Sequence, residues 1–285
     1  MSKGRNATAM SQAAVNGNLE ELKGHLKVAT ARGTSLNGNT HTACPLIETI
    51  IAINSQNQLE SIKLLLKEKL IDVNAYDDTG SCLDLAVKNN HPYALEAFKM
   101  LLNHPNINVN PVWGPFNITP LHRSIGKKIA PKYLELLLEH DSINVEMLTG
   151  KGHNVFHLQP STEQLTLLLQ SPKTTQAMII ANDNDGKTPL DIAVAKGNFD
   201  AVGLLLPYYL PFFKELVTFF LCNSAVDVRL PVSATRLIFS FLKFKMEQTS
   251  TVTTAIDFMT KYTPKTENEI EKKKDIMTFL DVYFQ

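Results

Sequence analysis

The residues of this chain that could take part in nucleophilic or acid–base chemistry are cysteines and histidines at the starts of predicted helices. Cys44 and Cys82 could act as nucleophiles, and His122 and His157 could act as bases. Nucleophilic catalysis needs a cysteine or serine with a base within hydrogen-bonding reach. The sequence contains no glycine-rich phosphate loop, no histidine and cysteine set at metal-ligand spacing, and no carboxylate pair in a recognisable setting. We therefore expect no catalytic residues, no metal site and no cofactor.

These four residues lie in segments that repeat one helical opening along the chain. The apolar position shared by the openings recurs at steps of 37, 38, 35 and 34 residues. This position is occupied by Leu46, Leu83, Leu121, Phe156 and Leu190. A regular period of this size indicates a solenoid, in which each unit buries its apolar face by stacking on its neighbours.

The repeated segments resemble the ankyrin repeat, whose period is about 33 residues. The copy that is most similar to the family consensus runs from Asp183 to Asn198 and contains Thr188-Pro189-Leu190. In ankyrin repeats the threonine and histidine of the Thr-Pro-Leu-His opening bond to neighbouring backbone. The resemblance therefore implies structural roles for His122 and His157. Cys44 and Cys82 occupy the same opening, and we interpret them as small packed residues.

The predicted fold is all-α, an ankyrin-repeat solenoid of about six repeats over residues 7–206, followed by a helical region over residues 207–285. Residues 7–30 form the expected amino-terminal cap, since a terminal repeat has one face that no neighbour covers. Pro207 and Pro211 break the period and mark the boundary. The carboxy-terminal region is either a cap on the last repeat or a separate small module.

Several local features depart from a regular repeat. The sequence predicts an extended first helix over residues 47–57 in the second repeat and a shortened fifth repeat at Gln159-Pro160. Three repeats close with similar segments, in which apolar residues point inward and polar residues face water. These segments are Ile71–Asn74, Ile107–Asn110 and Ile143–Glu146.

The composition excludes some classes of partner and location. The 28 Lys and Arg residues balance the 28 Asp and Glu residues, so no basic field favours nucleic acid. Three distant cysteines indicate a reducing, cytoplasmic compartment. The amino terminus has no apolar signal segment, and the apolar stretch 204–221 contains prolines and charges that make it a poor membrane span. We expect a soluble monomer.

Partner binding is expected on the projecting loops and on the exposed ends of the first helices. The candidate residues in the four loops are Tyr76, Asp77 and Asp78, then Trp113 and Phe116, then Lys151 and His153, then Asp183, Asn184 and Asp185. On the adjoining first helix, Arg123, Lys127 and Lys128 could engage an acidic partner or form an ordinary solvated face.

Trp113 is the chain's only tryptophan and lies in a loop bounded by proline and glycine. Two interpretations of this residue stay open. An aromatic side chain at a loop tip could anchor a partner protein. Alternatively, the indole could fold back over the neighbouring repeat, because a large apolar ring exposed to water without a partner is unusual.

The carboxy-terminal region contains two further resemblances. The segment Leu230–Leu242 is similar to the opening of an F-box, which implies docking onto a cullin-ligase adaptor through Leu230, Pro231, Ile238 and Leu242. An amphipathic helix that starts at a proline would have the same pattern for packing reasons. The segment Lys265–Leu280 resembles the export signal of type IV secretion substrates.

We therefore expect a non-enzymatic scaffold that binds a partner protein through its loops and concave face. The repeats and the export-like segment together suggest a secreted bacterial virulence effector that acts on a host protein in the host cytoplasm. Two alternatives stay open. One is a ubiquitin-ligase substrate adaptor that uses the F-box-like helix, and the other is an enzyme with its active site in the carboxy-terminal region.

Overall fold

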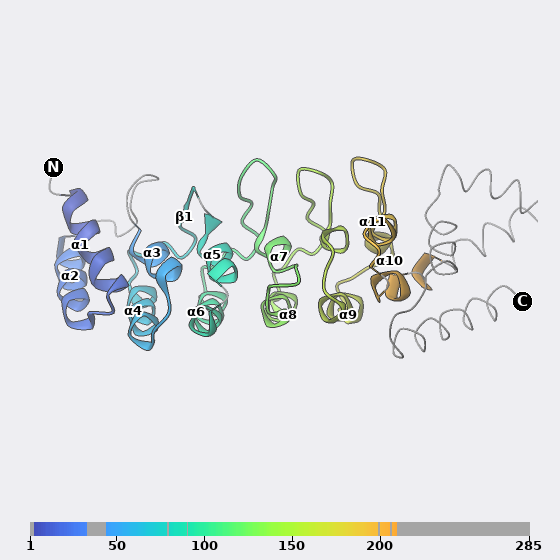
Figure 1. Ribbon diagram of the computed structural model, residues 1–285. Helices are drawn as coiled ribbons and strands as arrows, with labels where there is room; N and C mark the ends of the chain where they lie inside the picture. The colour runs from blue at the N-terminus through green and yellow to red at the C-terminus, as the bar shows by residue number, and fades with distance from the viewer. Residues whose placement is uncertain are drawn as a thin grey trace, which may run out of the picture. The chain divides into compact units, whose positions relative to one another are not determined.

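The computed structural model describes residues 3–32, 44–78, 80–89, 91–198, 200–205 and 207–209. The chain divides into two compact units, residues 1–155 and 156–285. Over the described residues both units consist of helices and loops, apart from one two-residue strand pair. The prediction of an all-α repeat fold is confirmed, and Figure 1 shows the helices as successive pairs in the first unit.

In its described residues, the first unit contains four helix pairs. Its elements are α1 (Lys3–Val15), α2 (Leu19–Arg32), α3 (Pro45–Ala52), α4 (Gln56–Lys67), β1 (Tyr76–Asp77), β2 (Gly80–Ser81), α5 (Cys82–Asn89), α6 (Pro92–Leu102), α7 (Pro120–Arg123) and α8 (Pro131–Glu139). The first helices pack in the order α1, α3, α5 and α7, and the second helices in the order α2, α4, α6 and α8. This arrangement gives each apolar face a neighbouring repeat to cover it.

The core of the first unit follows the repeated apolar positions. Leu46, Leu83 and Leu121 of the first helices are fully buried. So are the apolar residues of the second helices, among them Ile62, Leu65, Phe98, Leu101, Leu134 and Leu137. Phe98 and Tyr133 meet edge to face between α6 and α8, with ring centroids 5.1 Å apart. These contacts confirm that the leucine-rich second helices form the core between repeats.

The turn between α1 and α2 requires a glycine. Gly17 has a φ of +67°, which L side chains rarely adopt, and an added Cβ would lie 2.6 Å from Cβ of Asn57. In addition, the Gln58 side chain donates a 2.7 Å hydrogen bond to the carbonyl oxygen of Val15, the last residue of α1. The predicted Asn16-Gly17-Asn18 turn is therefore held directly against the next repeat.

The prediction of an extended helix over residues 47–57 is wrong, because α3 ends at Ala52. Ser55 then begins a capping box for α4, in which Ser55 accepts from the Gln58 amide and the Gln58 side chain accepts from the Ser55 amide. The carbonyl oxygens of Ile50 and Ile51, near the end of α3, accept hydrogen bonds from Asn89 at the end of α5. The sequence pattern missed this stop because the helix has no carboxy-terminal glycine.

The segments that close the repeats are bends and turns, not strands. Val73, Val109 and Val145 are buried, as predicted. The asparagine that follows each of the first two valines links one repeat to the next. Asn74 accepts from the Asn108 amide and donates to the Asn106 carbonyl, and Asn110 makes the same two bonds to the following repeat.

The second unit contains η1 (Val155–Leu158, which begins on the last residue of the first unit), α9 (Thr162–Gln170), α10 (Gln176–Ile179) and α11 (Pro189–Ala195). Residues 200–205 and 207–209 are also helical. The fifth repeat opens with a single 3-10 turn and Gln159 has a φ of +60°, so the predicted shortening is confirmed. Tyr209 donates a 2.7 Å hydrogen bond to the Ile179 carbonyl, and burial raises the pKa of its hydroxyl to about 12.

The predicted boundary near residue 207 lies at the end of the described part of the chain, and residues 210–285 lie outside it. Among the helices of the described residues, none combines the length and apolar character needed to cross a lipid bilayer.

Candidate protein-interaction surface

Three consecutive loops of the first unit are bonded to one another. The first is the β1–β2 hairpin, in which Tyr76 pairs with Ser81 and Asp77 with Gly80. The second spans residues 111–118, and the third spans residues 146–153. All three project on the same side of their helices in Figure 1.

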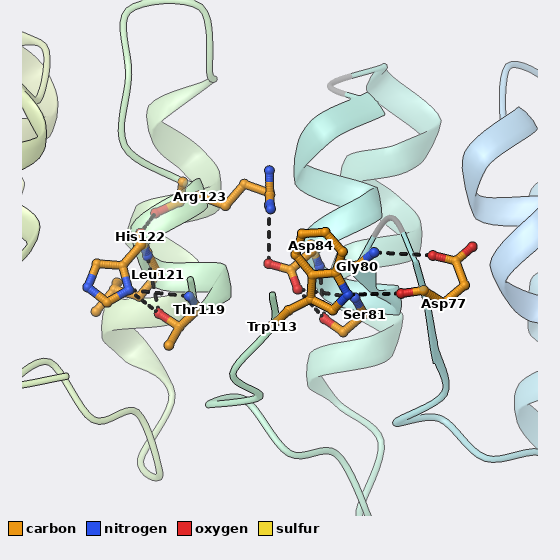
Figure 2. A network of polar contacts seen from close by, with 10 residues as sticks. Asp77, Gly80, Ser81, Asp84, Trp113, Thr119, Leu121, His122 and Arg123 are labelled. Carbon is orange, nitrogen blue, oxygen red and sulfur yellow. Dashed lines mark hydrogen bonds and ion pairs between the residues drawn. The ribbon is translucent and has the colours of Figure 1, made fainter. Parts of the chain in front are cut away.

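Trp113 joins the first two loops. Its indole Nε1 donates a 2.9 Å hydrogen bond to the carbonyl oxygen of Asp77 (Figure 2). Its backbone pairs with Ile118 through two hydrogen bonds, so the loop folds as a small antiparallel bridge. The side chain is half-buried. Of the two interpretations of Trp113, the structure shows the indole folded back onto the preceding repeat.

Phe116 and Gly150 join the second and third loops. The Gly150 amide donates a 2.7 Å hydrogen bond to the Phe116 carbonyl oxygen. A Cβ added to Gly150 would lie 3.3 Å from Cα of Phe116, which is tighter than an ordinary contact. A side chain at this position would require the second loop to shift by a few tenths of an ångström.

Large apolar side chains are exposed along these linked loops. We call the four of them together the loop surface: Tyr76 (62% exposed), Val112 (50%), Phe116 (58%) and Leu148 (52%). Tyr76 and Phe116 are among the residues predicted from the sequence, whereas Val112 and Leu148 are not. Val112 and Leu148 could have been predicted as exposed candidates, because both are large apolar residues in loops that the repeat pattern identifies.

A buried carboxylate lies next to the loop surface, in the first turn of α5. The Asp84 side chain is fully buried and accepts hydrogen bonds from the Ser81 hydroxyl (2.7 Å) and amide (3.1 Å). Arg123, on α7 of the next repeat, reaches it with Nε at 3.3 Å from Oδ1 (Figure 2). Burial raises the pKa of the Asp84 carboxyl, although Ser81 and Arg123 act in the opposite direction.

The role of Asp84 is not among the sequence-based predictions, although the sequence contains a signal for it. Asp84 follows Ser81 at the same spacing as His122 follows Thr119 and Asp191 follows Thr188, which is the spacing of a capping box. Its second role, as the partner of Arg123, depends on a residue 39 positions later in the chain.

His122 has the structural role that the sequence predicted. Its Nδ1 lies 2.8 Å from the Thr119 hydroxyl and accepts from the Thr119 amide, and its Nε2 lies 3.0 Å from the Met147 carbonyl oxygen. Burial lowers the pKa of the imidazole. His157 similarly bonds the Lys187 carbonyl oxygen, at 3.2 Å, within the second unit. Both side chains are therefore occupied in joining a helix start to a loop.

Cys44 and Cys82 are buried, as the packing interpretation predicts. Burial raises the pKa of the Cys82 thiol well above its ordinary value, so the reactive thiolate is disfavoured. Among the described residues, no group of three His, Cys, Asp or Glu side chains could hold a metal ion.

The remaining predicted residues of the first unit lie in or beside the linked loops. The Asp77 carboxylate accepts from the Gly80 amide at 3.1 Å and shapes the hairpin. The backbone amides of Lys151 and His153 both donate to the Thr149 hydroxyl. Asp78, Lys127, Lys128 and Lys151 are exposed, whereas His153 is half-buried.

In the second unit, Asp183 shapes a loop. Its side chain is buried, and Oδ1 accepts from the amides of Asp185 and Lys187, both at 2.9 Å. Asn184 and Asp185 are exposed. The predicted adaptor-binding residues lie outside the described residues; they are Leu230, Pro231, Ile238 and Leu242.

Comparison with known proteins agrees with this geometry. Residues 185–209 match the model of the Ankyrin repeat family. The ankyrin repeat domain of Bcl-3, a member of the IkappaB protein family, is similar in structure, with a TM-score of 0.58, 20% identity, and coverage of 70% of this chain and 85% of that chain. The ankyrin repeat protein EF0377 has a TM-score of 0.54 and 20% identity, over 69% of this chain and 96% of that chain.

A third similar chain comes from the complex of the predatory endopeptidase Bd0816 of Bdellovibrio bacteriovorus with the immunity protein Bd3460. Its TM-score is 0.53 at 20% identity, and the match covers 69% of this chain and 96% of that chain. No curated protein sequence matches this chain. The fold is therefore that of an ankyrin-repeat protein, and the match over residues 185–209 places a recognisable copy of the family's repeat in the second unit.

Proposed function

We propose that this protein is a non-enzymatic scaffold that binds a partner protein through the loop surface of its first unit. The observation that carries the proposal is the exposure of Tyr76, Val112, Phe116 and Leu148 on loops that are hydrogen-bonded to one another. Clustered exposed apolar side chains on a soluble protein commonly mark an interaction site. Aromatic residues such as Tyr76 and Phe116 are the usual anchors of such interfaces.

The hydrogen bonds between the loops hold the loops in position and should also raise the affinity for a partner. A partner that binds flexible loops must overcome the entropy cost of ordering them. Here the Trp113 side chain and the Gly150 amide already hold the neighbouring loops in place. The fold resemblance also includes a chain from a solved protein–protein complex, that of Bd0816 with Bd3460, which supports the proposal by analogy.

The proposal is tested by affinity capture from a eukaryotic lysate with the intact chain, followed by mass spectrometry. A variant that carries both Tyr76→Ser and Phe116→Ser should lose the partner. The matched control is Val28→Ser, which removes an apolar side chain that is 44% exposed on α2, away from the loops. Equal retention by the double variant and the intact chain would show that the loop surface is not the binding site.

The two finer hypotheses are tested by the same capture. The ubiquitin-ligase adaptor depends on residues 230–242, so a full-length chain with Leu230→Ala and Ile238→Ala should lose cullin-ligase components and keep its loop-surface partner. A host protein recovered reproducibly would support the bacterial effector role, and its compartment would test the cytoplasmic location. The enzyme alternative requires turnover that survives purification of the intact chain.

A further inference from the structure

Arg123 is held at one edge of its guanidinium, and the other edge makes no hydrogen bond to the described residues. The group makes its one hydrogen bond to the described residues through Nε, to the fully buried Asp84 carboxylate. Its terminal nitrogens make no hydrogen bond to the described residues, and the side chain is 25% exposed. A planar guanidinium that is fixed through Nε leaves its two terminal nitrogens side by side, the geometry that binds a carboxylate with two parallel hydrogen bonds.

The buried carboxylate explains why this arginine is ordered. Asp84 is itself held by the Ser81 hydroxyl and amide, so its position is determined within its own repeat. Figure 2 shows Arg123 extending from α7 toward the Asp84 carboxylate. An arginine fixed in this way loses less side-chain entropy on binding than a free surface arginine would.

The charge around Arg123 favours an acidic ligand. From Phe98 to Leu134 the sequence contains no aspartate or glutamate. The part of this stretch that forms the second loop and α7 continues into Lys127 and Lys128, which are both exposed. Arg123 thus belongs to a stretch of sequence that carries cations and no acids, although Asp84 of the preceding repeat pairs with its Nε. The exposed Phe116 and Val112 lie in the loop that leads into α7.

We propose that the partner inserts an acidic side chain, flanked by apolar residues, so that its carboxylate binds the terminal nitrogens of Arg123 while the apolar residues contact Phe116 and Val112. This inference rests on the proposed function, since it names the chemistry recognised next to the same surface. An acidic peptide is favoured over a nucleic acid because a nucleic-acid site needs many cations along a backbone, whereas the chain as a whole carries no net charge.

The test is selection of peptides from a random phage-displayed library on the full chain, followed by affinity measurement by fluorescence anisotropy. The expected peptides share an aspartate or glutamate next to apolar residues. Arg123→Lys keeps the charge but has no paired donors, and it should weaken binding by roughly tenfold or more. Replacing the shared acid by its amide should weaken binding to the intact chain similarly, with little further loss in Arg123→Lys. The matched control is Lys99→Gln, which removes a cation on α6 that pairs with Glu96.

Three outcomes would overturn this inference: no enriched peptide, enriched peptides without a shared acid, or unchanged affinity in Arg123→Lys. Displacement of the peptide by a single-stranded DNA oligonucleotide would also overturn it, since that result would indicate a phosphate ligand. Failure of the proposed function is a separate result, because it would be seen as partner capture that does not depend on Tyr76 and Phe116.

Discussion

The indole Nε1 of Trp113 donates a hydrogen bond to the carbonyl oxygen of Asp77, which lies 36 residues earlier, in the loop of the preceding repeat. The bond joins two loops that are separated along the chain by α5 and α6. It also satisfies the polar atom of a half-buried ring. Trp113 therefore helps to fix the positions of the loops that carry the loop surface.

Trp113→Phe should test this bond, since phenylalanine keeps an aromatic ring and lacks the donor. We expect the free energy of unfolding to fall by about 0.5–1.5 kcal/mol, the usual net value of one hydrogen bond. Urea denaturation should be followed by far-UV circular dichroism, because the variant lacks the chain's only tryptophan. As a comparison, the exposed Phe116→Ser should change stability by no more than about 0.5 kcal/mol. A Trp113→Phe chain as stable as the original would mean that the bond contributes nothing.

The Asp84–Arg123 pair predicts a specific pH dependence. Burial raises the pKa of Asp84 above its ordinary 3.8 in the folded chain, so the folded state holds this proton more tightly than the unfolded state does. The stability that Asp84 contributes is then greatest at low pH and is lost as the pH rises through the raised folded pKa. Arg123→Leu removes the cation that opposes this rise, so the loss should become larger.

The measurement is the melting temperature of Arg123→Leu and of Arg123→Leu with Asp84→Asn, between about pH 4 and pH 8. The single variant should fall below the double variant as the pH rises, by an amount that corresponds to roughly 1–3 kcal/mol at neutral pH for a buried carboxylate without its cation. Parallel curves for the two variants would show that Asp84 does not titrate in this way.

The parts of the structure that the sequence predicted are those that repeat. Leu46, Leu83 and Leu121 recur because every repeat must present the same face to its neighbours, so their burial follows from the period alone. The end of α3 was predicted wrongly because it depends on the Ser55 cap and on Asn89 from the next repeat. The Ser55-x-x-Gln58 pattern was a readable signal for the start of α4. Asn89 lies in the next repeat, so its contribution leaves no signal inside the helix that it ends.

The candidate site was only partly predictable for the same reason. The loops of Tyr76 and Phe116 could be located from the repeat pattern, and both residues prove to be exposed. The pairing of Arg123 with Asp84 could not be foreseen, since it depends on side-chain geometry across a repeat boundary. The two open interpretations of Trp113 likewise differed only in how its loop folds, and loop conformation is not encoded by the period.

His122 predicts a loss of stability in mild acid. Burial lowers its folded pKa below the ordinary 6.5, so the unfolded state takes up the proton first. The stability that depends on neutral His122 is therefore present above about pH 6.5 and is lost as the pH falls toward the folded pKa. Protonation of Nδ1 would also remove the acceptor of the Thr119 amide. His122→Gln, which does not titrate, should reduce the fall in melting temperature between about pH 7 and pH 5. If the variant shows the full acid dependence, another group is responsible.

Asn89 closes the end of a helix in a different repeat, and its amide nitrogen lies 2.9 Å from the Ile51 carbonyl oxygen and 3.1 Å from that of Ile50. Asn89→Asp keeps the shape of the side chain but replaces this donor with an acceptor that faces carbonyl oxygens. The matched control is Asn103→Asp, at the exposed end of α6, where the new charge meets the same unfavourable helix dipole without the carbonyls. Asn89→Asp should lower the free energy of unfolding by roughly 1–3 kcal/mol more than the control in urea denaturation. Equal losses in the two variants would assign the whole effect to the helix dipole, and the contact between α5 and α3 would then depend on apolar packing alone.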